Sequence, residues 1–105
     1  MAVTSKALFR GAATTTTTTV LYTVPASTTT VVTNIAVTNT GGSSYPFTLG
    51  MGPAAGQVSL HTTTTIAANT TVYIDCKQVL SATNTITGGA SNTAVNFHIS
   101  GVEIA

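Results

Sequence analysis

The chain has very little charge, because only five of its 105 residues are Lys, Arg, Asp or Glu. Soluble domains usually carry about 25% charged residues. The formal net charge of +1 excludes the basic surface that nucleic-acid binding requires. A neutral polar surface repels other proteins weakly and favours association. We therefore expect protein partners and no nucleic acid.

Cysteine and long apolar runs are also scarce. The single cysteine, Cys76, excludes an intramolecular disulfide and fits a reducing compartment. The first ten residues, MAVTSKALFR, lack the apolar stretch of a signal peptide or a membrane span. We therefore expect folding in the cytoplasm and no membrane partner. Hydrophobic residues still make up 43% of the chain, which argues against disorder.

Residues able to carry catalysis are few and scattered. His61 and His98 each follow an apolar strand residue, and the sequence contains no HExxH motif or Cys/His cluster of the kind that binds zinc. Cys76 is interpreted as a small core residue, since a cysteine nucleophile would need a base such as His98 beside it. A glycosidase-type pair would need Asp75 and Glu103, the only two carboxylates. We expect no enzymatic activity, no cofactor and no metal.

Threonine is abundant, and it forms two runs at 14–19 and 62–65. It is β-branched, so it resists helix, fits a pleated surface, and can pair across neighbouring strands. Two interpretations stay open. The runs are either surface strands of biased composition or neutral faces that pack against sister subunits. The second would also protect uncharged edge strands, which otherwise invite aggregation.

Apolar and polar residues alternate along most of the chain, which is the pattern of half-buried strands. The clearest strand is 31–39, where Val31, Ile35 and Val37 share the apolar face. Gly101 is expected to be a bulge at which the apolar phase shifts from odd to even positions. Residues 88–92 are expected to be a flexible loop. The other expected strands are 20–24, 45–51, 58–66, 71–76, 85–87 and 95–104.

This spacing predicts roughly seven to eight strands at intervals of about 8–12 residues, typical of a sandwich or barrel. No segment has a convincing helical period. The expected fold is an all-β, small antiparallel β-sandwich, Ig-like or jelly-roll-like, over residues 14–105. Residues 1–13 are expected to be an N-terminal arm, with at most one helical turn at Ser5–Gly11.

Two groups of side chains are candidates for contacting a partner. The arm combines basic and apolar residues and is expected to dock on a shell or a neighbour; a frayed terminus is the alternative. The three tyrosines are expected to form a contact patch, with packing at the core edge as the alternative. The candidate residues are Lys6, Leu8, Phe9, Arg10, Tyr22, Tyr45 and Tyr73.

Two stretches resemble small virion proteins of tailed bacteriophages. LYTVPA at 21–26 leads into VVTNIAVTNT at 31–40, and FHISGVEI at 97–104 is similar to the closing strand of the same group. The resemblance implies a β-sandwich subunit of a phage particle. Such subunits serve as capsid decoration or cement proteins, as head fibres, or as tail and baseplate accessories.

From this resemblance we expect a non-enzymatic capsid decoration or cement protein in the virion, assembled in the host cytoplasm. It is expected to pack as a symmetric homo-oligomer, with a trimer favoured, on the major capsid protein or other virion proteins. The alternative is a tail-fibre or baseplate module that contacts the host surface through the tyrosines and the glycine-rich loops.

Overall fold

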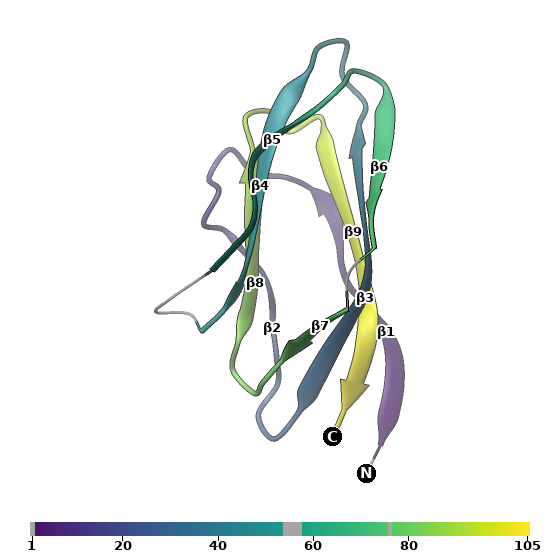
Figure 1. The fold of residues 1–105 in the computed structure, drawn as a ribbon, viewed down its shortest axis with the longest axis vertical. Coiled ribbons are helices and arrows are strands. Elements are labelled where there is room, and N and C mark those ends of the chain that lie inside the picture. The colour runs from purple at the N-terminus through teal and green to yellow at the C-terminus, as the bar shows by residue number, and fades with distance from the viewer. Residues whose placement is uncertain (1, 54–57, 76) are drawn as a thin grey trace.

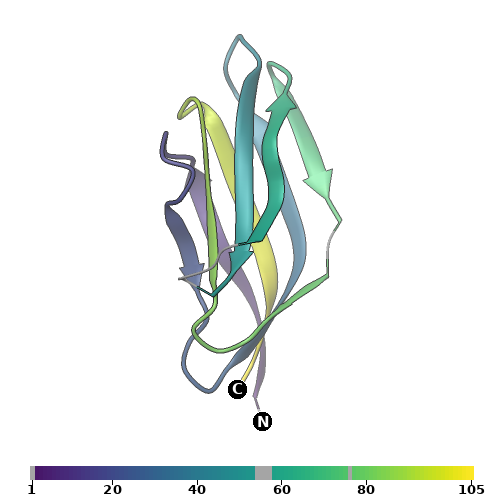
Figure 2. The same ribbon diagram turned by 60° about the vertical axis from the view of Figure 1, so that its left-hand side comes forward.

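The computed structural model describes residues 2–53, 58–75 and 77–105, and this part of the chain forms two antiparallel β-sheets without a helix (Figures 1 and 2). The all-β sandwich prediction is confirmed. No helix that could span a membrane occurs among these residues. The strands are β1 (Val3–Ala12), β2 (Val20–Thr23), β3 (Thr29–Asn39), β4 (Tyr45–Gly52), β5 (Val58–Ile66), β6 (Thr70–Ile74), β7 (Gln78–Leu80), β8 (Thr85–Ala90) and β9 (Val95–Ile104).

The order of the strands is that of a jelly roll. The five-stranded sheet runs β1-β9-β3-β6, with β7 also paired to β3, and the four-stranded sheet runs β2-β8-β4-β5. Apart from the β4–β5 hairpin and the link from β6 to β7, every connection crosses from one sheet to the other (Figure 1). Of the two predicted sandwich types, the structure therefore has the jelly-roll one.

The core lies between the sheets and is filled by alternate residues of the long strands. Phe47 and Phe97 meet edge to face at its centre, with ring centroids 6.1 Å apart. Ile35 and Val37 are fully buried, as their alternation predicted. Among the described residues, every buried polar side-chain atom has a hydrogen-bond partner, so the threonine-rich chain buries its hydroxyls without leaving them unpaired.

The segment expected to be an arm forms part of the five-stranded sheet. Residues 3–12 are β1, which pairs with β9 from Val3–Ile104 to Ala12–Asn96. Ser5–Gly11 contains no helical turn because it lies within this strand, in which Leu8 is an extra residue between Ala7 and Phe9. Leu8 is buried and Phe9 packs against the core, so the bulge lets two adjacent apolar residues of one strand contact the core.

The expected phase shift at Gly101 in β9 is wrong. Odd-numbered residues of β9 continue to face the other sheet to the end of the strand, where Glu103 points between the two sheets. The bulges lie instead in both neighbouring strands, at Leu8 in β1 and at Thr33 in β3. Gly101 accommodates them because it has no side chain: a Cβ there would lie 2.4 Å from the carbonyl oxygen of Val31.

The bulge in β3 also changes which of its residues are buried. Val31 was predicted on the core face, but Val32 is fully buried and Val31 lies half-exposed on the opposite face. Beyond Thr33 the odd-numbered residues Ile35 and Val37 face the core. One inserted residue reverses the faces of a strand, since side chains alternate with a period of two.

Residues 88–90, expected in a loop, are the second half of β8. All six residues of β8 are buried, and β8 lies between β2 and β4 in the four-stranded sheet. Gly88 and Gly89 fit there because their neighbours approach closely. A Cβ on Gly88 would lie 2.7 Å from Cδ2 of Leu49, and one on Gly89 would lie 2.4 Å from the carbonyl oxygen of Thr16.

The first threonine run is a loop that covers the free edge of β8. The amide of Ala90 donates to the carbonyl oxygen of Thr14 at 2.9 Å, and that of Gly88 donates to the carbonyl oxygen of Thr19 at 3.0 Å. The hydroxyls of Thr14 and Thr19 lie 2.6 Å apart, at 3.0 and 2.9 Å from the carbonyl oxygen of Thr16. The threonines therefore curl the loop by local hydrogen bonds.

The second threonine run lies in the edge strand β5 and contains a bulge. Phe47 pairs with Thr64 and Leu49 pairs with His61, so two residues of β5 face one of β4. Thr63 has φ of 49° and donates its amide to Oγ1 of Thr48 at 3.1 Å. A β-branched residue is strained in this left-handed conformation.

Thr63→Asn is expected to stabilise the fold by about 0.5–1 kcal/mol, because asparagine tolerates left-handed backbone better than threonine. The measurement is the urea midpoint followed by far-UV circular dichroism. Thr65→Asn is the matched control in the same strand. It should lower the midpoint slightly, since Thr65 has ordinary strand geometry and asparagine is a poor strand residue. Equal effects at both positions would contradict the strain at Thr63.

Candidate interaction surfaces

The four candidates from the N-terminal segment do not lie together in one exposed patch. Leu8 is 7% exposed and belongs to the core, and Phe9 is half-buried against it. Lys6 is bound to Glu103 at the end of the sandwich. Arg10 is exposed and extends from the outer side of the five-stranded sheet, opposite His98.

The three tyrosines do not gather into one patch either. Tyr22, on β2, is buried between the sheets, and Tyr45 is half-buried at the start of β4. Tyr73 is 73% exposed on β6, in the other sheet. Tyr22 and Tyr45 therefore pack at the edge of the core, and of the three tyrosines only Tyr73 has a ring that is largely exposed to solvent.

Groups with reactive side chains remain dispersed in the structure. The described residues contain no group of three His, Cys, Asp or Glu that could hold a metal. Asp75 and Lys77 form a surface ion pair at 3.6 Å, and both side chains are exposed. Cys76 and the side chain of His61 lie outside the described residues. His98 is exposed on the outer side of β9.

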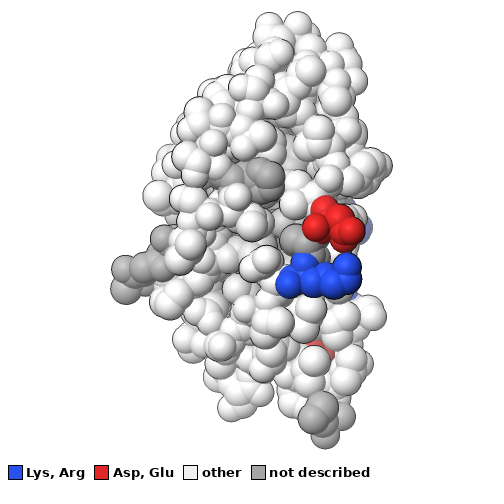
Figure 3. All heavy atoms as spheres, viewed as in Figure 1, with Lys and Arg blue, Asp and Glu red and all other residues white. Residues whose placement is uncertain are grey.

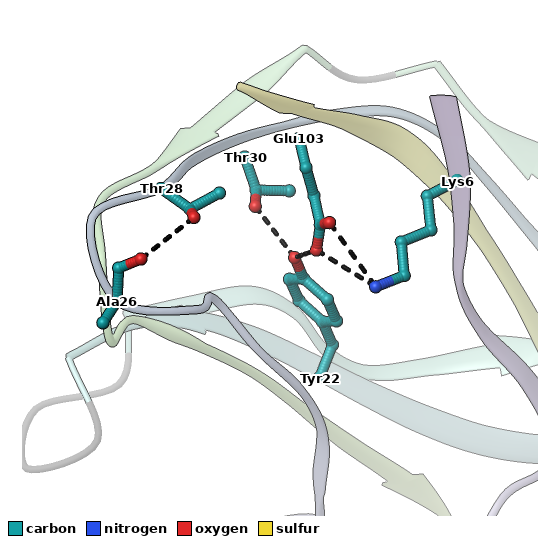
Figure 4. Close-up of polar contacts among 6 residues, drawn as sticks. All are labelled: Lys6, Tyr22, Ala26, Thr28, Thr30 and Glu103. Atoms are coloured by element: carbon teal, nitrogen blue, oxygen red, sulfur yellow. Dashed lines mark hydrogen bonds and ion pairs between the residues drawn. The ribbon is translucent and has the colours of Figure 1, made fainter. Parts of the chain in front are cut away.

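A buried polar cluster closes one end of the sandwich (Figure 4). The Tyr22 hydroxyl, reaching from the four-stranded sheet, donates to the Glu103 carboxylate and accepts from Thr30 at 2.9 Å. Lys6 approaches the same carboxylate at 3.3 Å, and the Glu103 side chain is 14% exposed. The sequence gives no local signal for this cluster, because Tyr22 and Glu103 are 81 residues apart.

The cluster shifts both of its titrating groups. The hydrogen bond from Tyr22, together with Lys6, holds the pKa of Glu103 below its ordinary value. Burial, and then the hydrogen bond to Glu103, raises the pKa of Tyr22. The cluster therefore favours a charged carboxylate beside a neutral phenol. Because Tyr22 and Glu103 belong to different sheets, their hydrogen bond joins the two sheets.

Acid is expected to weaken the fold through Glu103. Because its folded pKa is lowered, its contribution is complete above the ordinary value of 4.5 and is lost as the pH falls through the lower folded pKa. The urea midpoint should fall over this range, and Glu103→Gln should flatten the fall. Asp75→Asn, which changes an open carboxylate, should leave it unaltered. An identical pH profile for Glu103→Gln and the original chain would refute this role.

The edges of the five-stranded sheet are guarded against strand addition. The edge strand β1 has a bulge at Leu8 and places Lys6 on the side that faces Glu103. At the opposite edge, β6 and β7 are separated by a segment that carries the exposed Asp75–Lys77 pair. Bulges, inward-pointing charges and exposed charges are the devices that prevent edge pairing.

The edges of the four-stranded sheet are guarded without charge. On one side, β2 has only four residues, and the 14–19 loop covers β8 beyond it. On the other side, β5 is bent by the bulge at Thr63. Since both sheets have guarded edges, a partner has better access to their faces.

The outer face of the five-stranded sheet, which we call the outer face, is broad and almost uncharged. The end of this face at which β1 begins carries the exposed valines Val3 and Val79, at 65% and 68% exposure. Figure 3 shows acidic and basic atoms together on the side of the molecule where β6 and β7 lie, with a smaller acidic area below them, and the exposed Asp75–Lys77 pair lies between these two strands. The strand register sets five rows across the outer face: Val3–Ile104–Thr29, Ser5–Val102–Val31–Val79, Ala7–Ser100–Asn34, Arg10–His98–Ala36–Tyr73 and Ala12–Asn96–Thr38–Thr71.

No protein-family model matches the chain, and no curated protein matches its sequence. Solved structures of virus particles do match its fold. The infectious bursal disease virus Gx strain aligns with a TM-score of 0.59 at 12% identity, and the VP2 subviral particle of that virus with 0.57 at 10%. Its T13 viral particle aligns with 0.55 at 11%.

These alignments cover 97% of this chain but only 30 or 31% of the matched chains. The chain therefore spans less than a third of each of these viral capsid proteins. At such low identity the likeness establishes a shared fold.

Proposed function

We propose that the chain is a non-enzymatic structural protein of a virus particle. More specifically, we propose that it decorates or cements the capsid of a tailed bacteriophage as a symmetric oligomer. The observation that carries this proposal is the broad, nearly uncharged outer face of a jelly-roll sandwich. A surface with few charges and some exposed apolar side chains, such as Val3, Val79 and Tyr73, favours protein–protein contacts.

The fold supports the proposal without deciding it. Jelly rolls recur in viral capsid domains, but also in lectins and cupins, so function has to be argued from surfaces. Here the similar solved structures are viral capsid proteins, and the LYTVPA and SGVEI motifs resemble virion proteins of tailed phages. The guarded edges also suit a part present in many copies, since they suppress unwanted strand pairing between copies.

Cementing has a simple thermodynamic basis. A protein that binds only the assembled shell stabilises it by mass action, and the stabilisation grows with the concentration of free protein. The low charge of the whole chain suits this task, because few charged groups lose their hydration on docking. The major capsid protein is the proposed receptor.

The test is to add the purified chain to phage capsids that lack it. Binding at a copy number comparable with that of the major capsid protein, together with a higher temperature of capsid disruption, is expected. Immunogold label should then cover the head. Label restricted to the tail would favour the tail-fibre or baseplate alternative, and no binding to expanded capsids would refute the cementing role.

A further inference from the structure

We propose that two copies of this chain pair through the outer face, about a two-fold axis that runs along the strands between β9 and β3. In this pair, Arg10 of each copy lies against the ring of Tyr73 of the other copy. The pairing is a property of the chain itself and does not depend on its proposed role in a virus particle.

The row that contains both residues has a cation, Arg10, at one end and an aromatic ring, Tyr73, at the other. Arg10 lies opposite His98, His98 opposite Ala36, and Ala36 opposite Tyr73, so the row crosses four strands. Its ends are three strand spacings apart, about 14 Å. Side chains stand roughly perpendicular to a sheet, and a cation binds a ring within about 6 Å of its centre. Arg10 therefore does not reach Tyr73 of its own chain.

A two-fold axis parallel to the strands brings the two ends together. This rotation reverses the order of strands across the face and keeps every row at its own height. The β1 strand of one copy then lies over β6 of the other, which places Arg10 over Tyr73. In the same way, β9 lies over β3, so Val102 of one copy packs on Val31 of the other. Each contact occurs twice, as in any isologous interface.

The size of the outer face fits a pair of copies. It is four strands wide, and β1 and β9 have ten residues each. At about 4.8 Å per strand and 3.4 Å per residue, its flat area is about 650 Å² per copy. Stable interfaces bury about 800 Å² of accessible surface per partner. The flat estimate for the whole face approaches this size, whereas its valine end alone supplies only part of it.

The chemistry of the outer face favours a copy of itself. The two end residues of the row are Arg and Tyr, which are enriched among the residues that dominate interface energetics. Arg10 is the only Lys, Arg, Asp or Glu in the five rows, and the exposed Asp75–Lys77 pair lies at the β6–β7 edge. A partner that matches this face is therefore largely neutral and has one aromatic ring at the height of Arg10, and the two-fold copy supplies both.

The first test is the self-association of the full chain, measured by sedimentation equilibrium. We expect a reversible dimer that Val79→Asp weakens by at least about tenfold in Kd, because two charges are placed in a desolvated contact. Val58→Asp is the matched control: both valines are 68% exposed on edge strands, but Val58 lies in the other sheet. It should leave the dimer unchanged. A trimer, a monomer at all concentrations, or equal effects of the two variants would overturn the pairing.

The second test addresses the Arg10–Tyr73 contact itself. Two exposed cation–π contacts per dimer correspond to about a 5–30-fold change in Kd. Arg10→Ala and Tyr73→Ala should each weaken the dimer by about this factor. The double variant should be little weaker than either single one, since both remove the same contact. Independent, multiplying effects would overturn this contact.

The third test fixes the symmetry by cross-linking. In a Cys76→Ser background, Arg10→Cys combined with Tyr73→Cys should give a covalent dimer on mild oxidation. The two positions are about 14 Å apart within one chain, beyond the limit of about 7 Å for a disulfide. Arg10→Cys alone should remain uncross-linked, because its copies lie at opposite edges of the pair. Capsid binding by a monomeric variant would leave the proposed function intact while separating it from the pairing.

Discussion

Gly101→Ala is expected to destabilise the fold by about 3 kcal/mol, the upper part of the range for overpacking a core. A Cβ at Gly101 would lie 2.4 Å from the carbonyl oxygen of Val31 and 2.9 Å from Cδ1 of Leu8. Val31 belongs to the central strand β3, which pairs with β9 on one side and with β6 and β7 on the other. Its backbone cannot withdraw without disturbing this pairing.

The free energy of unfolding, from urea titration followed by circular dichroism, measures the effect. Gly42→Ala is the matched control, since a Cβ there has no neighbour within 4 Å. It should change stability by no more than about 0.5 kcal/mol. Similar effects at the two glycines would show that β3 and β1 approach β9 less closely at Gly101 than described here.

Gly89→Val is expected to destabilise the fold by about 2 kcal/mol and to promote aggregation. A Cβ at Gly89 would lie 2.4 Å from the carbonyl oxygen of Thr16 and 2.8 Å from that of Thr14. The 14–19 loop must therefore lift away, which breaks the bond from the amide of Ala90 to Thr14. The edge of β8 then becomes open to strand addition.

Hydrogen exchange separates loss of the loop from general weakening. The amide of Ala90 should exchange faster in Gly89→Val, whereas amides of the distant β3–β9 pairing should lose only the protection that the lower global stability explains. Thr17→Val, an exposed change within the same loop, should leave exchange at Ala90 unaltered. Unchanged protection of Ala90 in Gly89→Val would show that the loop does not cover this edge.

Alternation alone identified the long strands apart from β1, which was predicted as an arm. Ile35 and Val37 were placed correctly because a half-buried strand leaves a period of two in its sequence. The faces of Val31 and Val32 were exchanged, since a bulge in one strand depends on the strands beside it. No residue near Thr33 in the sequence indicates that the neighbouring strand β9 carries Gly101.

The candidate interaction residues were predicted from their side-chain types, and the structure shows which of them are exposed. A sequence favours Arg10 and Tyr73 as exposed contact residues, but it cannot place them in one row, because that row depends on the pairing of β1, β9, β3 and β6. The cluster of Tyr22 and Glu103 was missed for the same reason. Both residues acquire their partners only when the two sheets pack together.

The sequence by itself determined the all-β class, the approximate strands and the scarcity of charge, since these follow from local composition and alternation. The tertiary structure decided the jelly-roll order, the positions of the bulges and the use of the threonines at 14–19 as an edge cover. These features depend on contacts between residues far apart in the chain. A local pattern records which face of a strand is apolar, but it does not record which strand lies beside it.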